Sequence, residues 1–297
     1  MDTDEFIHLE ALIASASDGV SREEWHGFSV VIFKEQWGVL VLSEWGAQVL
    51  WYQPAGQEHP VLWVTATPAP HPRPIRGGIP LCWPWFGDHP SEAFLPAHGV
   101  ARTARWNITQ KELEASSVFI ELQPEETPLW NSVDVSLQVQ ANGSALTIML
   151  ASRNLGAEPV ELTQALHTYL AISSRANVHI ASLDNVKYAD KLANYDEFVQ
   201  QGNLHFDQAI DRIYQSVETI YLHDQGWQRS LEVGKLSSAS TVVWNPAEAG
   251  ARMADIGADQ VDQFVCVESA RTQQFDRQTL AAGESVTLGT RLKVINL

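Results

Sequence analysis

The sequence predicts an antiparallel β-sandwich, an all-β fold with a few short helices. Apolar residues recur at a period of two over many short segments rich in Val, Ile, Leu and aromatic residues, which is the pattern of strands. Turn residues separate these segments, and Asn142-Gly143 between two of them predicts a hairpin. Of the 297 residues, 45% are hydrophobic and 19% are charged, a composition that can build a sizeable core. No composition break marks a linker, so we expect a single domain over residues 1–297.

The expected elements follow the chain in order. Phe6, Leu9, Leu12 and Ile13 lie at helical spacing, so the N-terminal extension over residues 1–26 is expected to be helical, with a short helix over 6–16. Strands are expected over 29–35, 38–43, 48–53, 117–122 and 134–139, and then over 160–172, 178–181, 218–222, 230–233, 240–244, 263–267 and 285–294. Residues 65–76 are too rich in proline for a central strand and predict a loop across a sheet edge, whereas 188–200 predict a short helix or an excursion.

Charge and cysteine content narrow the class of protein. The formal net charge is −17, from 36 acidic and 19 basic residues without a Lys/Arg block, which disfavours nucleic acid and anionic membranes as partners. No segment approaches 18 consecutive apolar residues, and the N-terminus lacks the features of a signal peptide. The two cysteines, Cys82 and Cys266, are too few for a disulfide framework. We therefore expect a soluble cytoplasmic protein, and a monomer.

Candidate ligand-binding residues gather in two nearby motifs, RGGIPLCWPWFG at 76–87 and HGVAR at 98–102. The two glycines after Arg76 allow the backbone to approach a ligand closely. Arg76 and Arg102 are candidate anion ligands because a guanidinium matches phosphate oxygens, although either alone could form a surface salt bridge. His98 could orient a sugar hydroxyl or cap a turn. Asp211 could accept hydrogen bonds from hydroxyls or pair with a neighbouring arginine.

Two residues are candidates for acid and base chemistry. His167 lies in a strand-like segment with apolar neighbours, where a histidine taken alone is most often a core residue bonded to backbone. Glu268 follows the apolar run FVCV, and taken alone it is as readily an ordinary acid at a strand end. Together they form a candidate general acid/base pair if the fold brings them into one pocket. The chain shows no metal-ligand spacing, P-loop, GxGxxG or GxSxG motif, so no metal or other cofactor is expected.

The ordered motifs resemble those of the hexose-6-phosphate mutarotases, or glucose-6-phosphate 1-epimerases, relatives of the aldose 1-epimerases. They are RGGIP at 76–80, WPWFG at 83–87, HGVAR at 98–102, LHTY at 166–169, DRIY at 211–214, VWNP at 243–246 and VE at 267–268. The resemblance extends from about residue 27 to the C-terminus and implies a galactose-mutarotase-like β-supersandwich. It implies catalytic roles for His167 and Glu268, and substrate binding by Arg76, Arg102 and Asp211, with the arginines recognising the phosphate. Many relatives have glutamine before the His-Gly motif, where this chain has alanine at position 97.

The implied reaction interconverts the α and β anomers of a hexose 6-phosphate, with glucose 6-phosphate as the first candidate. Glu268 would remove the proton of the anomeric hydroxyl while His167, as imidazolium, protonates the ring oxygen. Three alternatives stay open. They are an aldose 1-epimerase for unphosphorylated sugars, a noncatalytic carbohydrate-binding β-sandwich, and a glycoside hydrolase, which usually needs a second carboxylate.

Overall fold

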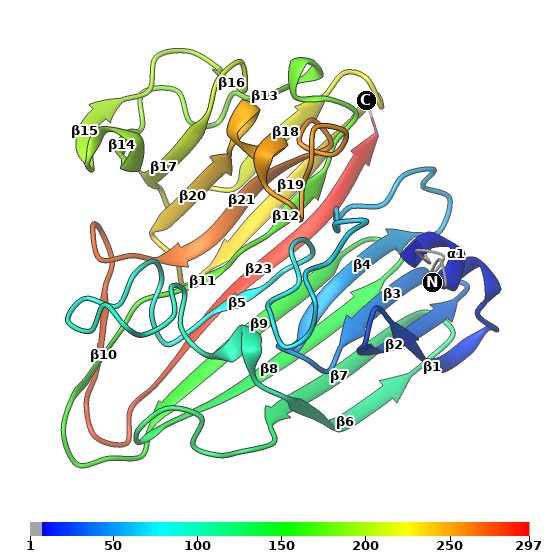
Figure 1. Cartoon of the computed structure of the whole chain (residues 1–297), viewed down its shortest axis with the longest axis horizontal. Helices are drawn as coiled ribbons and strands as arrows, with labels where there is room; N and C mark the ends of the chain where they lie inside the picture. Colours follow the sequence, from blue (N-terminus) through cyan, green and yellow to red (C-terminus); the bar gives the residue numbers. More distant parts are fainter. Residues whose placement is uncertain (1–7, 297) are drawn as a thin grey trace.

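The computed structural model describes residues 8–296, which form antiparallel sheets with one short α-helix and four 3₁₀ turns (Figure 1). The helix is α1 (Leu9–Ser15), and the 3₁₀ turns are η1 (Ala101–Thr103), η2 (Arg175–Asn177), η3 (Lys191–Ala193) and η4 (Ala247–Arg252). None of the helices between residues 8 and 296 is long and apolar enough to cross a membrane. The predicted all-β fold class is confirmed.

Two large sheets make up most of the molecule. The nine-stranded sheet has the order β16 (Leu204–His205), β13 (Val178–Ile180), β18 (Ile220–Asp224), β19 (Arg229–Leu236), β23 (Ser285–Asn296), β9 (Leu146–Asn154), β8 (Val133–Asn142), β7 (Ser117–Pro124) and β6 (Trp106–Leu113). The eight-stranded sheet has the order β15 (Asp196–Val199), β14 (Lys187–Asp190), β17 (Ile210–Gln215), β20 (Ser240–Asn245), β21 (Phe264–Arg271), β11 (Gln164–Leu166) and β5 (Leu81–Cys82), with β12 (Tyr169–Ala171) also paired to β21.

Two smaller sheets complete the fold. Strands β1 (Gly19–Trp25), β2 (Phe28–Glu35), β3 (Gly38–Ser43) and β4 (Gln48–Pro54) form a meander in chain order, and β10 (Val160–Leu162) pairs with β22 (Gln278–Leu280). Figure 1 shows the meander and α1 at the opposite corner of the molecule from β14 and β15. In α1, Leu9 and Ile13 are buried four residues apart, so one face of the helix packs on the meander beside Phe28.

Burial follows the sequence pattern where one sheet face is solvated. Along β8, buried and partly exposed residues alternate, and the buried ones join a core cluster shared by both large sheets and the meander. In β21, by contrast, every residue from Phe264 to Ala270 is buried, because both of its faces are covered. Strand β21 is therefore the central strand around which the candidate site is built.

The structure corrects the predicted elements at four places. The extension is helical only over Leu9–Ser15, since Gly19–Trp25 pairs with β2, and Phe6 lies outside the described residues. Residues 188–200 form the β14–β15 hairpin around η3. The predicted strand over 160–172 is three short strands, and Glu268 lies within β21 instead of at its end. The proline-rich loop over 65–76 and the hairpin at Asn142-Gly143 are confirmed, and the single domain stays a prediction.

Candidate active site

A break between β11 and β12 positions His167 beside Glu268. Both strands pair with β21, through Leu166 opposite Ser269 and Tyr169 opposite Cys266. Within the break, the His167 N–H donates to the Pro80 carbonyl at 3.0 Å, while the carbonyl of the next residue, Thr168, accepts from Val267 at 3.1 Å. The imidazole Nε2 consequently lies 3.4 Å from Glu268 Oε1. The structure thus brings together the two residues predicted to form an acid/base pair.

Burial pushes both members of the pair toward their neutral forms. The Glu268 side chain is 1% exposed and neither carboxyl oxygen has a hydrogen-bond partner. Burial raises the pKa of Glu268 well above its ordinary value, and the charge of Asp211 raises it further. Burial also lowers the pKa of His167, and electrostatic interactions with His98, Arg102 and Arg76 lower it more. Both shifts favour a protonated Glu268 carboxyl beside a neutral imidazole.

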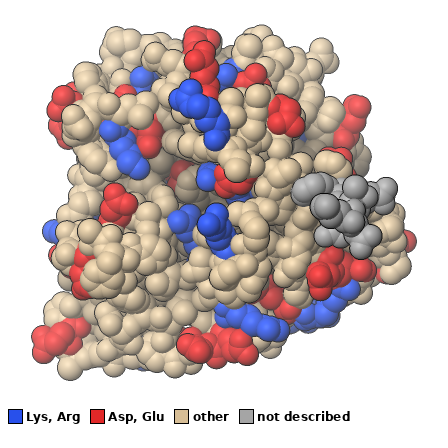
Figure 2. Space-filling view, viewed as in Figure 1, with Lys and Arg blue, Asp and Glu red and all other residues tan. Residues whose placement is uncertain are grey.

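The arginine side of the site is a cavity of about 540 Å³ lined by His167, Tyr169, Arg76 and Arg102 together with the loop over 67–75. The Arg76 guanidinium donates through Nε to Asp255 at 2.7 Å and through Nη1 to the Tyr169 hydroxyl at 3.4 Å. The Tyr169 ring stacks on the His167 imidazole, with centroids 4.8 Å apart and planes at 14°. Figure 2 shows Lys and Arg side chains gathered around a hollow near the middle of this face.

Backbone contacts hold both arginines in place. The buried Gln48 amide donates to the carbonyls of Ile75 and Gly77, at 3.0 and 2.6 Å, and so fixes the chain on either side of Arg76. Arg102 donates through Nη2 to the Ala97 carbonyl at 2.7 Å. A backbone contact at position 97 thus engages Arg102 directly.

Glycines of the two motifs lie in close backbone packing, and the approach of a ligand to the two glycines after Arg76 stays a prediction. Gly78 has φ +59°, and a Cβ there would lie 2.1 Å from the carbonyl oxygen of Val49. Gly99 has φ +76°, and its Cβ would lie 2.0 Å from the carbonyl oxygen of Trp83. Both positions require glycine because neither the space nor the backbone conformation admits a side chain.

His98 lies beside the His167 imidazole but does not line the larger cavity. Its Nδ1 accepts from the Gly87 N–H at 3.2 Å, as expected of a residue that caps a turn, and its ring meets the His167 ring edge-on at 5.9 Å. Burial, followed by the charges of Arg102, Lys191 and Arg76, lowers the pKa of His98 to about 3. His98 is therefore neutral at physiological pH and can present its remaining nitrogen only as a neutral group.

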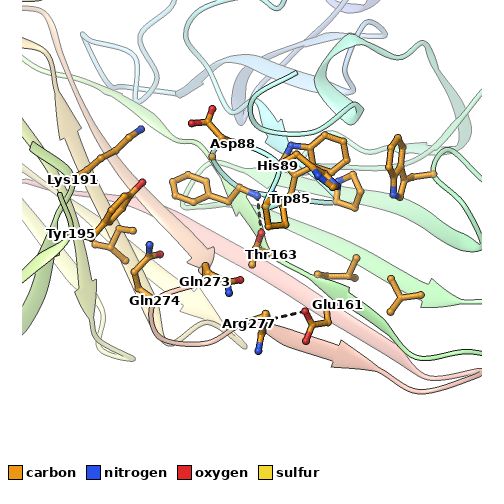
Figure 3. Close-up of a pocket in the computed structure, with 18 of the residues that line it drawn as sticks. Trp85, Asp88, His89, Glu161, Thr163, Lys191, Tyr195, Gln273, Gln274 and Arg277 are labelled. Carbon is orange, nitrogen blue, oxygen red and sulfur yellow. Dashed lines mark hydrogen bonds and ion pairs between the residues drawn. The ribbon is translucent and has the colours of Figure 1, made fainter. Parts of the chain in front are cut away.

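Asp211 lines a second, neighbouring cavity of about 380 Å³ (Figure 3) and does not line the cavity that contains His167. Its carboxylate lies 3.7 Å from Lys191 Nζ, and the figure shows Lys191 and Tyr195 across the cavity from Trp85 and His89. In register, Asp211 pairs with Trp244 on β20, which pairs with β21. Two strand spacings of about 4.8 Å put Asp211 roughly 10 Å from β21, so it acts on Glu268 through space.

Three of the residues that shape the site were missed by sequence reasoning as functional. Tyr169 was part of a quoted motif but carried no role, and Lys191 lay in a segment of undecided structure. Asp255 contacts Arg76 across 179 residues, and no local pattern around it predicts this contact.

A thiol also lies against the pair. His167, Glu268 and Cys266 offer donor atoms within 4.8 Å of one another, the closest approach to a metal-binding set among residues 8–296. Burial raises the pKa of the Cys266 thiol well above its ordinary value, and the cationic Arg76 and Arg102 face the same space. Both effects oppose a bound cation, and the arrangement suits proton transfer better than metal binding.

The sequence was also compared with models of known protein families. The sequence model of the family described as aldose 1-epimerase matches residues 30–293. The chain belongs to the aldose 1-epimerase family. This confirms the resemblance inferred from the ordered motifs, and membership supports an isomerase activity on sugars.

Individual relatives agree with this placement. A protein of Escherichia coli (strain K12), provisionally named glucose-6-phosphate 1-epimerase, is 33% identical over 242 residues, which cover 79% of this chain and 80% of that protein. A crystal structure from Salmonella typhimurium, provisionally described as a mutarotase, has a TM-score of 0.87 at 26% identity and covers 98% of this chain and 100% of its own. A galactose mutarotase-like protein from Clostridium acetobutylicum shares the fold, with a TM-score of 0.71 at 13% identity over 94% of this chain and 98% of that chain.

Proposed function

We propose that the protein interconverts the α and β anomers of a hexose 6-phosphate, with glucose 6-phosphate as the first substrate to test. The observation that carries the proposal is the 3.4 Å approach of His167 and Glu268 beside a cavity that also holds Arg76 and Arg102. An acid and a base at this spacing suit anomerisation, and two guanidinium groups suit a phosphate. The name of the relative from Escherichia coli points to the same substrate.

The proposed reaction uses one base and one acid. The Glu268 carboxylate accepts the proton of the anomeric hydroxyl while the His167 imidazolium donates a proton to the ring oxygen, and the bond between C1 and the ring oxygen breaks. The product is the open-chain aldehyde, with the proton now on Glu268 and the imidazole neutral. After rotation about the C1–C2 bond, the same transfers run in reverse and close the ring on the other face. No redox change occurs, and the proton count of the pair is restored.

The remaining residues have proposed roles in binding. Arg76 and Arg102 bind the phosphate from the larger cavity, where the Asp255 and Ala97 contacts hold their guanidinium groups. Asp211, at the second cavity, accepts hydrogen bonds from sugar hydroxyls. His98, as a neutral imidazole, orients a hydroxyl near His167.

The proposal is tested by NMR exchange spectroscopy of the anomeric protons of glucose 6-phosphate and of free glucose. We expect the wild type to accelerate exchange of the phosphate ester, and His167→Asn and Glu268→Gln each to lose about 10²- to 10⁴-fold of that acceleration. His205→Asn and Glu125→Gln change exposed residues of the same types and serve as matched controls. Faster anomeric exchange of glucose alone would favour an aldose 1-epimerase for unphosphorylated sugars. Unchanged exchange of both sugars would favour a noncatalytic carbohydrate-binding β-sandwich.

A further inference from the structure

Two guanidinium groups and one neutral imidazole lie around the His167 imidazole. Arg76 reaches it through Tyr169, whose hydroxyl accepts from the guanidinium at 3.4 Å and whose ring stacks on the imidazole. Arg102 lines the same cavity, and the His98 ring lies edge-on at 5.9 Å. The only carboxylate within 4 Å of the imidazole among the described residues is Glu268, at 3.4 Å. An imidazolium at position 167 therefore forms near two guanidinium groups. Arg76 is paired with Asp255 at 2.7 Å, whereas Arg102 donates to the Ala97 carbonyl and has no carboxylate within 4 Å among the described residues.

We propose that a dianion bound between Arg76 and Arg102 switches on the acid/base pair, so that the protein anomerises unphosphorylated glucose when an inorganic dianion is supplied separately. This inference rests on the proposed function and extends it. In the ordinary substrate the phosphate group is the dianion, and it acts as an activator as well as a handle. The site thereby has a further activity, anion-dependent anomerisation of neutral hexoses.

The switch moves one proton within the pair. Without a dianion, burial and the two arginines disfavour the His167 imidazolium, and burial favours the protonated Glu268 carboxyl. A dianion offsets the charges of Arg76 and Arg102, while the anomeric hydroxyl donates to the Glu268 carboxylate and stabilises its ionised form. The proton then resides on His167, which is the arrangement that anomerisation requires. Each unit by which the pKa of His167 rises multiplies its imidazolium fraction about tenfold.

This device separates two sources of specificity. If the arginines only bound the phosphate, and bound it equally in the ground state and the transition state, glucose would have a higher KM than glucose 6-phosphate but the same kcat. Saturating glucose would then reach the full rate. If the dianion is also the switch, saturating glucose alone leaves the His167 imidazole neutral. The kcat for glucose is then lower than the kcat for glucose 6-phosphate. A separately supplied dianion then raises kcat for glucose.

The experiment measures enzyme-catalysed anomerisation of glucose with sulfate or with potassium chloride at equal ionic strength. Sulfate is used because it is a dianion at neutral pH with no proton to exchange, and the enzyme-free rate is subtracted for each solution. We expect saturable activation by sulfate of at least about tenfold in kcat, and none by chloride. Arg76→Ala is expected to abolish the activation, while Arg105→Ala, a change at an exposed arginine paired with Glu125, retains it.

The outcomes separate this inference from the proposed function. Acceleration of glucose 6-phosphate together with unchanged or reduced glucose turnover in sulfate would overturn the switch and leave the proposed function standing. No acceleration of glucose 6-phosphate would overturn the proposed function. A second readout, the ¹⁵N chemical shifts of the His167 ring in the Glu268→Gln protein, is expected to move toward imidazolium on adding sulfate. Unmoved shifts at saturating sulfate would also refute the switch.

Discussion

The pH dependence of stability tests whether the buried pair is neutral, and it does so without a substrate. In the folded protein the pKa of Glu268 is raised above its ordinary 4.5 and that of His167 is lowered below its ordinary 6.5. At each pH between 4.5 and 6.5 that lies below the raised pKa of Glu268 and above the lowered pKa of His167, the folded pair holds one proton, on Glu268. The unfolded chain also holds one, on the histidine. Because the folded and unfolded states bind the same number of protons at these two residues, the wild-type pair adds nothing to the pH dependence of the free energy of unfolding in this window.

Each single substitution removes the cancellation. In Glu268→Gln the unfolded chain binds one proton more than the folded protein, so stability rises with pH by about 1.4 kcal/mol per pH unit up to pH 6.5. In His167→Asn the folded protein binds one proton more, so stability falls by the same amount per unit above pH 4.5. Across these two units, each variant diverges from the wild type by up to about 2.7 kcal/mol, in opposite directions.

Urea unfolding at five pH values between 4.5 and 6.5 measures this divergence. The quantity of interest is the free energy of unfolding of each variant minus that of the wild type, which removes the titration of all other groups. The exposed substitutions Glu125→Gln and His205→Asn are expected to run parallel to the wild type. Parallel profiles for Glu268→Gln and His167→Asn as well would refute the neutral pair, and with it the proton placement on which the anion switch depends.

Three further predictions concern the surroundings of the pair. Gly99→Ala is expected to destabilise the protein by more than about 1 kcal/mol in urea unfolding, since its Cβ meets the Trp83 carbonyl; an unchanged midpoint would contradict this packing. Arg102→Ala is expected to lower kcat/KM for glucose 6-phosphate by about 10- to 100-fold, through loss of a charged hydrogen bond, without lowering the rate on glucose; equal losses on both sugars would argue against phosphate recognition. Tyr169→Phe keeps the ring on His167 but frees Arg76 from the hydroxyl, so we expect a several-fold higher KM for the phosphate ester in steady-state kinetics, and an unchanged KM would leave the hydroxyl without a positioning role.

The fold could be predicted from the sequence where burial is one-sided. The alternation in β8 records which residues face the core, so the strand was predicted within a few residues of its bounds. Residues 160–172 were predicted to form one strand because the segment is largely apolar. The break at His167 depends on a hydrogen bond to Pro80, which lies 87 positions earlier in the sequence. In β21 the carboxylate of Glu268 was interpreted as a strand end, since only the tertiary structure shows that a buried strand carries it.

The residue types of the candidate site were predicted better than their positions relative to one another. His167, Glu268, Arg76 and Arg102 converge as an acid/base pair and an anion site require. Asp211 lies at the neighbouring cavity instead. That separation depends on strand order in the eight-stranded sheet, where β20 lies between β17 and β21, and strand order across such sequence distances leaves no local signal.

The interrupted ladder at β11 and β12 has a consequence for how turnover proceeds. Because β11 and β12 both pair with the strand that carries Glu268, the separation of acid and base is fixed by backbone hydrogen bonds on either side of the break. Relative motion of the two backbone segments would require opening the pairing with a central buried strand, which belongs to the most protected class of motions in a protein. The rotation that exchanges the anomers must therefore be supplied by the opened sugar, turning in front of a stationary pair. For the proposed reaction, the backbone that carries the pair therefore stays in place between one sugar and the next.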